Sequence, residues 1–340
     1  MRKLLNVLYV TTPDAYLSKD GMNVVVSVNQ EEKFRIPIVN IEGIVTFGYK
    51  GTSPGLMKLC ADNGVALSFL SPNGRFIGRF QGTVHGNVLL RKAQYQIADD
   101  KEQALHYARL FVAGKIQNYR TILQRFVRDN GSNLEVETAV KALEVNKRCA
   151  LRTKEVPSLM GVEGDAANTY FGVFPNLLLQ NKEEFPFQGR NKRPPKDAVN
   201  AMLSFVYTLL AHETAAALET VGLDPYVSFL HALRPGRTSL ALDLMEELRA
   251  YLGDRLVLSL INRRQVASSD FIAQGESGVV MTDNCRKTIL TAWQSRKMET
   301  IVHPYLEEKI SVGLLPYVQA LLLARAVRGD IDDYPVFLIH

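Results

Sequence analysis

The sequence lacks several features that mark common functional classes. It has only 3 cysteines in 340 residues, and Cys60, Cys149 and Cys285 are scattered without a CxxC pair. This pattern argues against a disulfide framework or a structural zinc site, and it is typical of a reducing compartment. The sequence also has no P-loop, no GxGxxG after a strand, no GxSxG and no HExxH. The usual signatures of nucleotide binding, esterases and zinc proteases are therefore missing.

Long hydrophobic runs are missing too. A membrane-spanning helix needs about 18–20 apolar residues, and the best run here, Leu203–Ala211, ends at His212 and Glu213. The apolar run at the N-terminus stops at Val10 and has no small-residue cleavage site, so it predicts a first strand rather than a signal peptide. We therefore expect a cytoplasmic protein that does not bind membranes.

The chain carries no strong charge of either sign. Lys and Arg number 40 against 35 Asp and Glu, a net charge of +5. Any nucleic-acid binding must therefore depend on local basic clusters. With 46% hydrophobic and 22% charged residues the composition is that of a globular protein, and 340 residues predict two domains.

The first 85 residues have the alternation and turn residues of a β-rich domain. Short strand-like runs occur at 24–28, 34–38 and 75–80. Asp20-Gly21 and Asn73-Gly74 are two-residue turn signals, because glycine adopts positive φ without steric cost. One helix is predicted over Pro54–Asn63, with Ser53 as its N-cap.

Helical periodicity begins at residue 88, after an expected linker over residues 82–87. The expected helices are Val88–Ala98, Lys101–Arg128, Leu134–Arg152, Ser158–Phe171, Asp197–Glu219, Ser239–Tyr251, Asn284–Thr300 and Leu314–Arg328, with one hairpin at Ile272–Met281. The sequence thus predicts an α+β protein. A small N-terminal β-rich domain, residues 1–85, precedes a larger, mostly α-helical domain, residues 86–340.

Glu163 is a carboxylate in an unusual position. On a helical wheel it lies near the middle of an apolar stripe, while Asp165 and Asn168 lie on the opposite side. An ionised carboxylate that faces a core is costly unless a cation or a metal ion meets it. Gly161 and Gly164 beside it would let another helix or a ligand approach closely. Pairing with a core arginine is the structural alternative.

Three acids lie together on the predicted helix Ser239–Tyr251. Asp243 and Glu246 are about 60° apart on the wheel and could ligate one divalent ion. Glu247 is equally well placed relative to Asp243, so the spacing alone does not choose between the two glutamates. Taken alone, a solvated acidic face is the favoured interpretation of these residues.

His231 precedes this acidic helix by one short basic turn, which contains Arg234 and Arg237. Such a turn would fold the histidine back over the carboxylates. A histidine with carboxylates from separate helices suits Mg²⁺ or Mn²⁺, and nearby arginines suit phosphodiester chemistry.

Four separated elements resemble one protein family. They are LMGVEG at residues 159–164, RPPKDAVNAMLS at 193–204, His231, and SLALDLME at 239–246. Together they are similar to the CRISPR-associated Cas1 family, and most of all to the form found in type I-C systems. The resemblance covers essentially the whole chain.

The resemblance implies a metal-dependent DNA endonuclease and integrase of CRISPR adaptation, which joins the 3′-hydroxyl ends of short foreign DNA into the CRISPR array. It implies that Glu163, His231 and Glu246 bind Mg²⁺ or Mn²⁺ and that Asp243 is an adjacent essential acid. It favours Glu246 over Glu247. It also implies binding of double-stranded DNA, a homodimer joined through the β-rich domains, and a complex with the small Cas2 protein.

Two further predictions concern DNA. The basic residues that we expect to contact it are Arg190, Lys192, Arg193, Arg234, Arg237, Arg249, Arg263 and Arg264. The alternative function is a catalytically silent DNA-binding scaffold of the same fold, in which the acids are merely solvated or ion-paired.

Overall fold

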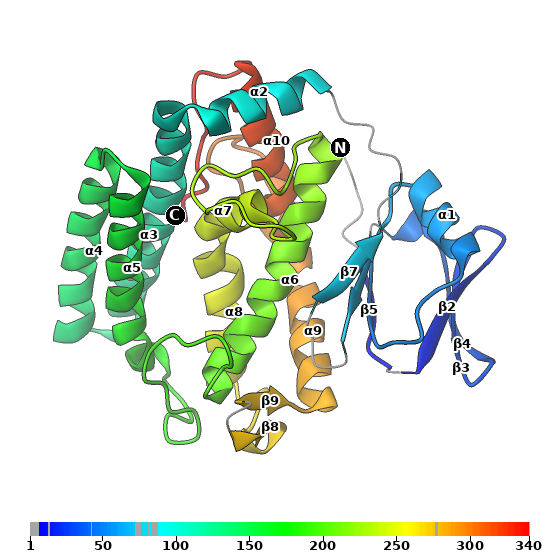
Figure 1. The fold of residues 1–340 in the computed structure, drawn as a ribbon. Coiled ribbons are helices and arrows are strands. Elements are labelled where there is room, and N and C mark those ends of the chain that lie inside the picture. The colour runs from blue at the N-terminus through cyan, green and yellow to red at the C-terminus, as the bar shows by residue number, and fades with distance from the viewer. Residues whose placement is uncertain are drawn as a thin grey trace. The chain divides into compact units, whose positions relative to one another are not determined.

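A computed structural model describes residues 7–12, 14–41, 43–71, 76–80, 82, 88–275 and 278–339. The chain divides into two compact units, Met1–His85 and Gly86–His340. Strands dominate the first unit and helices the second (Figure 1). The predicted α+β fold class is therefore confirmed. The dimerising and catalytic roles expected of the two domains stay predictions.

The described residues of the smaller unit form two sheets. Its strands are β1 (Val7–Val10), β2 (Ala15–Asp20), β3 (Asn23–Val28), β4 (Glu31–Pro37), β5 (Gly43–Phe47), β6 (Ala66–Leu70) and β7 (Phe76–Phe80). One sheet has the order β1-β5-β6-β7, in which only β7 is antiparallel to its neighbour, and the other is the antiparallel meander β2-β3-β4. Helix α1 (Pro54–Asp62) connects β5 to β6, as a parallel strand pair requires.

Local signals in this unit act as the sequence predicts. Gly21 has φ +55° in the β2–β3 turn, and the Ser53 side chain accepts the backbone N–H of Leu56 at the start of α1. The Asn73-Gly74 turn lies outside the described residues, as does the expected linker apart from Gly82.

The larger unit is a helical bundle. Its α-helices are α2 (Val88–Asp99), α3 (Lys101–Asn130), α4 (Leu134–Arg152), α5 (Val156–Gly172), α6 (Ala198–Val221), α7 (Ser239–Leu248), α8 (Arg255–Asn262), α9 (Asp283–Met298) and α10 (Leu315–Arg328). Short antiparallel pairs form between β8 (Phe271–Ala273) and β9 (Val279–Met281), the predicted hairpin, and between β10 (Thr300–Val302) and β11 (Lys309–Ser311).

The acidic helix continues further than the sequence suggests. After α7 the backbone passes through a π-helix, η3 (Arg249–Asp254), directly into α8. The predicted helix Ser239–Tyr251 stops short of α8. The sequence of α8 does carry a helical period, because its polar residues Arg255, Ser259 and Asn262 lie on one half-buried face and the residues between them are buried.

Helix α6 lies against α7 and α10 near the middle of the unit (Figure 1). By length and composition alone it could cross a membrane, which the search for apolar runs did not suggest. However, 61% of its most apolar window is buried inside the protein, as in the core helix of a globular domain. Helices α3, α4 and α5 pack on one another, and α3 also contacts α7.

Candidate metal centre

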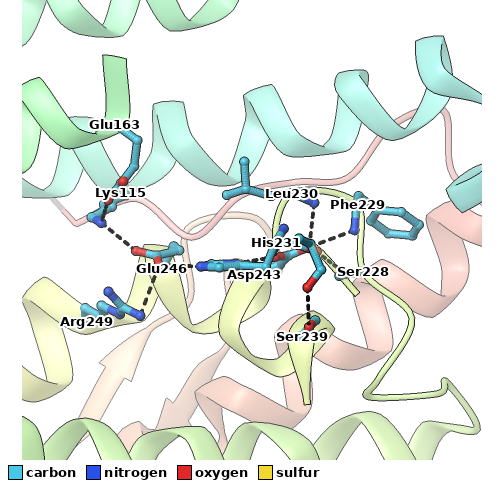
Figure 2. Close-up of polar contacts among 11 residues, drawn as sticks. Lys115, Glu163, Ser228, Phe229, Leu230, His231, Ser239, Asp243, Glu246 and Arg249 are labelled. Atoms are coloured by element: carbon cyan, nitrogen blue, oxygen red, sulfur yellow. Dashed lines mark hydrogen bonds and ion pairs between the residues drawn. The ribbon is translucent and has the colours of Figure 1, made fainter. Parts of the chain in front are cut away.

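Helices α5 and α7 bring two carboxylates together around Lys115, which lies on α3 (Figure 2). Lys115 is 1% exposed and donates through Nζ to a carboxylate oxygen of Glu163 on α5. Its Nζ also lies 2.7 Å from Oε2 of Glu246 on α7. One buried ammonium group therefore joins two carboxylates that are 83 residues apart in the sequence (163 to 246).

Glu246 is held as a buried anion. It is 2% exposed, and the guanidinium of Arg249 lies 3.0 Å from its Oε1. Burial alone would raise its pKa, but the charges of Arg249 and Lys115 outweigh burial and lower the pKa to about 2. Its Oε2 has no well-aligned hydrogen bond among the described residues. Glu246 is thus ionised at neutral pH, and the ammonium of Lys115 is the cation beside its Oε2.

Asp243 positions the histidine. It is 0% exposed, and the backbone N–H groups of Phe229, Leu230 and His231 donate to its oxygens at 2.8, 2.9 and 3.1 Å. Nδ1 of His231 lies 2.6 Å from Asp243 Oδ1. Because a carboxylate only accepts, Nδ1 of the neutral ring carries the proton and Nε2 the lone pair. Nε2 lies 4.0 Å from Oε1 of Glu246, so the predicted folding back of His231 over the acidic helix is observed (Figure 2).

Glu247 belongs to a different cluster. It is 0% exposed and accepts hydrogen bonds from the Tyr334 hydroxyl, from Gln319 Nε2 at 2.8 Å and from the Phe337 N–H at 2.9 Å. Burial raises its pKa to about 7, with these hydrogen bonds opposing the rise. The structure thus places Glu246, not Glu247, beside the histidine. Glu247 instead binds the C-terminal segment through Tyr334 and Phe337.

The interpretation of the three acids as a solvated face is wrong. Asp243, Glu246 and Glu247 are all buried, because α7 is enclosed by α3, α6 and α10 rather than lying at the surface. The wheel gave their angular separation correctly but could not show that both sides of the helix are covered.

The predicted setting of Glu163 is partly confirmed. Asp165 and Asn168 are exposed, as predicted, while Glu163 is only half-buried. Its cationic partner is a lysine, not the core arginine considered as the alternative. A Cβ built on Gly161 or Gly164 would have no neighbour within 4 Å, so no other described helix approaches closely there.

Sequence reasoning missed Lys115. The available signal was its register: it lies four residues after Phe111 and four before Tyr119, and both aromatic side chains are buried. A lysine at this spacing lies on the core face of a helix, where it needs a carboxylate partner.

The basic residues predicted to contact DNA occupy different settings. Arg190 donates to Asn200 and Ser204 at 2.7 and 3.0 Å, and Arg249 pairs with Glu246. The side chains of Lys192, Arg193, Arg234, Arg263 and Arg264 are exposed, and that of Arg237 is half-buried. Burial and the neighbouring Arg234 lower the pKa of Arg237, so these two arginines lie close together. Arg190 and Arg249 thus have structural partners, as does Arg264, which donates to Gln180 at 2.9 Å. The role of all eight residues in DNA binding stays a prediction.

The donor set at this centre fits a divalent cation. Two carboxylates and an imidazole nitrogen are ligands that suit Mg²⁺ or Mn²⁺. Within the described part of the chain, the buried Oε2 of Glu246 has only the Lys115 ammonium as a partner. Among the described residues no three His, Cys, Asp or Glu side chains already converge as a metal site. The ammonium takes the cationic place between the two glutamates, so an ion could bind only if Lys115 withdrew from at least one of them.

Comparison with known proteins identifies the family of the chain. The family described as "CRISPR associated protein Cas1" matches residues 8–295. A protein of Chlorobaculum tepidum named "CRISPR-associated endonuclease Cas1 1" is 50% identical over 341 residues, which cover 99% of each chain. A protein of Rhodospirillum rubrum named "CRISPR-associated endonuclease Cas1 2" is 47% identical and covers 98% of each chain.

Solved structures show the same fold at lower identity. A Cas1 protein from Thermotoga maritima superposes with a TM-score of 0.82 at 22% identity, covering 98% of this chain and 100% of that one. A structure described as "Casposase bound to integration product" has a TM-score of 0.83 at 23% identity and covers 97% of this chain and 94% of that one. These likenesses concern the fold alone.

Proposed function

Because the chain belongs to the Cas1 family of CRISPR-associated endonucleases, we propose that it is a divalent-metal-dependent DNA endonuclease and integrase of CRISPR adaptation. The reaction would join 3′-hydroxyl ends of short foreign DNA into the CRISPR array by phosphodiester transfer. The observation that carries the proposal is the meeting of Glu163 and Glu246 on one buried cation, with Nε2 of His231 directed at Glu246.

Glu163, His231 and Glu246 are the residues that would hold Mg²⁺ or Mn²⁺. When bound, the ion would act as a Lewis acid: it would polarise the scissile phosphate and make the attacking oxygen a better nucleophile. Within the chain, Asp243 fixes the tautomer and orientation of His231 through four accepted hydrogen bonds. Asp243 is therefore a positioning residue, because all four of these donors come from the chain itself.

Lys115 and Arg249 set the charge of the centre. The carboxylates of Glu163 and Glu246 contribute two negative charges, and the two cations contribute two positive ones. With a divalent ion added, these four groups and the ion carry a net positive charge, which favours a phosphodiester anion. When no ion is bound, Lys115 also holds the two carboxylates together, because two neighbouring negative charges would otherwise repel each other.

The remaining features of the family are proposals for this chain as well. We propose that it acts on double-stranded DNA in the cytoplasm, as a homodimer joined through residues 1–85, together with a small Cas2 protein. A solved assembly described as a "Cas6-RT-Cas1--Cas2 complex" contains a chain of the same fold (TM-score 0.81, 20% identity, covering all of this chain and 36% of that one). The type I-C form stays a prediction from the sequence.

A catalytically silent DNA-binding scaffold is the second candidate. The observation in its favour is that Glu163 and Glu246 already have a cationic partner in Lys115. In a scaffold that ion pair would be purely structural, and its acids would have no part in chemistry.

Cleavage and strand joining of DNA, measured with Mg²⁺, with Mn²⁺ and with a chelator, distinguish the two. We expect metal-dependent activity that Glu163→Gln, His231→Ala and Glu246→Gln each abolish, because loss of any ligand disables the same step. Asp165→Asn is the matched control, since Asp165 lies on the same helix as Glu163 with an exposed side chain. Full activity in any of the three variants would remove that residue from the site. No activity under any condition would favour the scaffold.

A further inference from the structure

A second basic site lies between α8 and α9, away from the catalytic cluster. It is a groove of about 670 Å³. Its charged lining consists of Arg255, Arg263, Lys287 and Arg296 with a single acid, Glu299. None of these residues contributes to the cluster around Lys115. We call this site the α8–α9 groove.

The two innermost arginines are held in place. The guanidinium groups of Arg255 and Arg296 lie over the ring of Tyr251, 5.1 and 4.7 Å from its centroid. Arg296 is fixed further by Glu299 at 2.7 Å and by the Tyr251 carbonyl at 3.4 Å. Side chains that are already ordered lose little entropy when an anion binds.

Positive charge in the groove is not neutralised. Four cations and one acid leave a net charge of +3 on the lining. Arg255 has no ion-pair partner in the part of the chain that the structure describes, and burial together with the nearby Arg296 lowers its pKa. Two guanidinium groups held close together without a full set of counter-ions are what an external anion would stabilise.

The other lining groups suit phosphate. The hydroxyls of Ser259, Thr288, Thr291 and Ser295 line the groove, and phosphate oxygens accept hydrogen bonds from hydroxyl and arginine donors alike. Lining residues on α9 run from Asn284 to Arg296, which is about 18 Å along the helix axis. This strip is longer than one phosphate group and spans several phosphates of a single strand.

We propose that the α8–α9 groove binds the phosphodiester backbone of a nucleic-acid strand, as a second contact site apart from the catalytic cluster. The choice of nucleic acid as the source of the phosphates rests on the function proposed above. The groove itself rests on its own charge, order and length. Because its donors are guanidinium, ammonium and hydroxyl groups, binding depends on the backbone and not on the base sequence.

The test is a salt series on the full chain with chelator present, so that no metal chemistry takes part. Arg263→Gln/Lys287→Gln removes two exposed charges from the groove. Lys141→Gln/Lys154→Gln, also exposed, removes the same charge elsewhere. Fluorescence anisotropy is measured with two unrelated labelled oligonucleotides, single-stranded and duplex.

We expect the groove variant to bind both sequences more weakly, and by the same factor. Its plot of log affinity against log salt concentration should be about two units flatter, one unit for each lost phosphate contact. The control variant keeps the slope of the unchanged protein. Equal slopes for the two variants would overturn the proposal, as would a loss confined to one sequence. Circular dichroism of both variants shows that the fold is kept.

Competition separates the sources of phosphate. Inorganic phosphate and a nucleoside triphosphate, each at the phosphate concentration of the oligonucleotide, should displace it poorly from the unchanged protein. Displacement as efficient as by unlabelled DNA would identify a small-anion site and contradict the proposal. If the unchanged protein fails to cleave DNA while the groove variant loses slope, the proposed function fails and the groove stands. If it cleaves DNA and the groove variant binds normally, only the groove fails.

Discussion

Lys115 offers a quantitative test of the charge balance at the candidate centre. Lys115→Met keeps the length of the side chain but removes its charge, which leaves the buried carboxylate of Glu246 with Arg249 as its remaining cation. Removing one partner of a buried ion pair costs about 3–5 kcal/mol of stability. Lys147→Met is the control: Lys147 is half-buried and lies 3.0 Å from Glu144, and such outer pairs contribute about 0–1 kcal/mol.

The assay is urea unfolding with chelator and then with Mn²⁺. We expect Lys115→Met to lose several times more stability than Lys147→Met when no divalent ion is present. We also expect Mn²⁺ to stabilise Lys115→Met more than the unchanged protein, because the ion no longer competes with an ammonium group and binding stabilises by mass action. The reasoning would be refuted if Lys115→Met had the same free energy of unfolding as the unchanged protein. It would also be refuted if Mn²⁺ stabilised both proteins equally.

Three further predictions concern neighbouring groups. Burial raises the pKa of Asp254 from 3.8 to about 6, so its contribution to stability is full below pH 3.8 and is lost as the pH rises through about 6. In urea unfolding, the unchanged protein should therefore lose about 3 kcal/mol of unfolding free energy, relative to Asp254→Asn, as the pH rises from 3.8 to about 6. Glu247→Ala should cost about 2–5 kcal/mol by orphaning buried donors, whereas Glu247→Gln should cost less, and limited proteolysis of the C-terminal segment should follow the same order. Neutralising Arg234 and Arg237 should flatten the salt dependence of duplex binding by about one unit each, equally for unrelated sequences; a loss for one sequence only would contradict backbone contact.

Much of the fold could be predicted from local patterns. Helix α4 (Leu134–Arg152) has the predicted bounds, because Asn133 caps it and its apolar residues keep a helical period. Helix α8 has such a period too, with Arg255, Ser259 and Asn262 on one face, but it is only 8 residues long and follows a π-helix, so the helix predicted from the sequence stops short of it.

The site was predictable in its residue types and not in its contacts. A carboxylate on an apolar stripe, Glu163, pointed to a buried cation, and resemblance to a family selected Glu246 over Glu247. The wheel alone could not make that choice, because it depends on Tyr334, Gln319 and Phe337, which lie far along the chain and meet Glu247 only after folding.

Lys115 shows the same limit from the other side. Its core register was visible in the sequence, but its carboxylate partners come from α5 and α7, which are 48 and 131 residues further along (163 and 246 against 115). The position of Asp243 was likewise visible, whereas its role in holding the loop of His231 depends on three backbone N–H groups.

In the proposed function, Glu163, His231 and Glu246 together bind one divalent ion. Anomalous diffraction from a crystal of the protein soaked in Mn²⁺ tests it most directly. We expect a single anomalous peak bounded by these three side chains, with the ammonium of Lys115 withdrawn from at least one glutamate. A Mn²⁺ peak elsewhere, or Lys115 still bridging both glutamates with no peak between the three side chains, would contradict it.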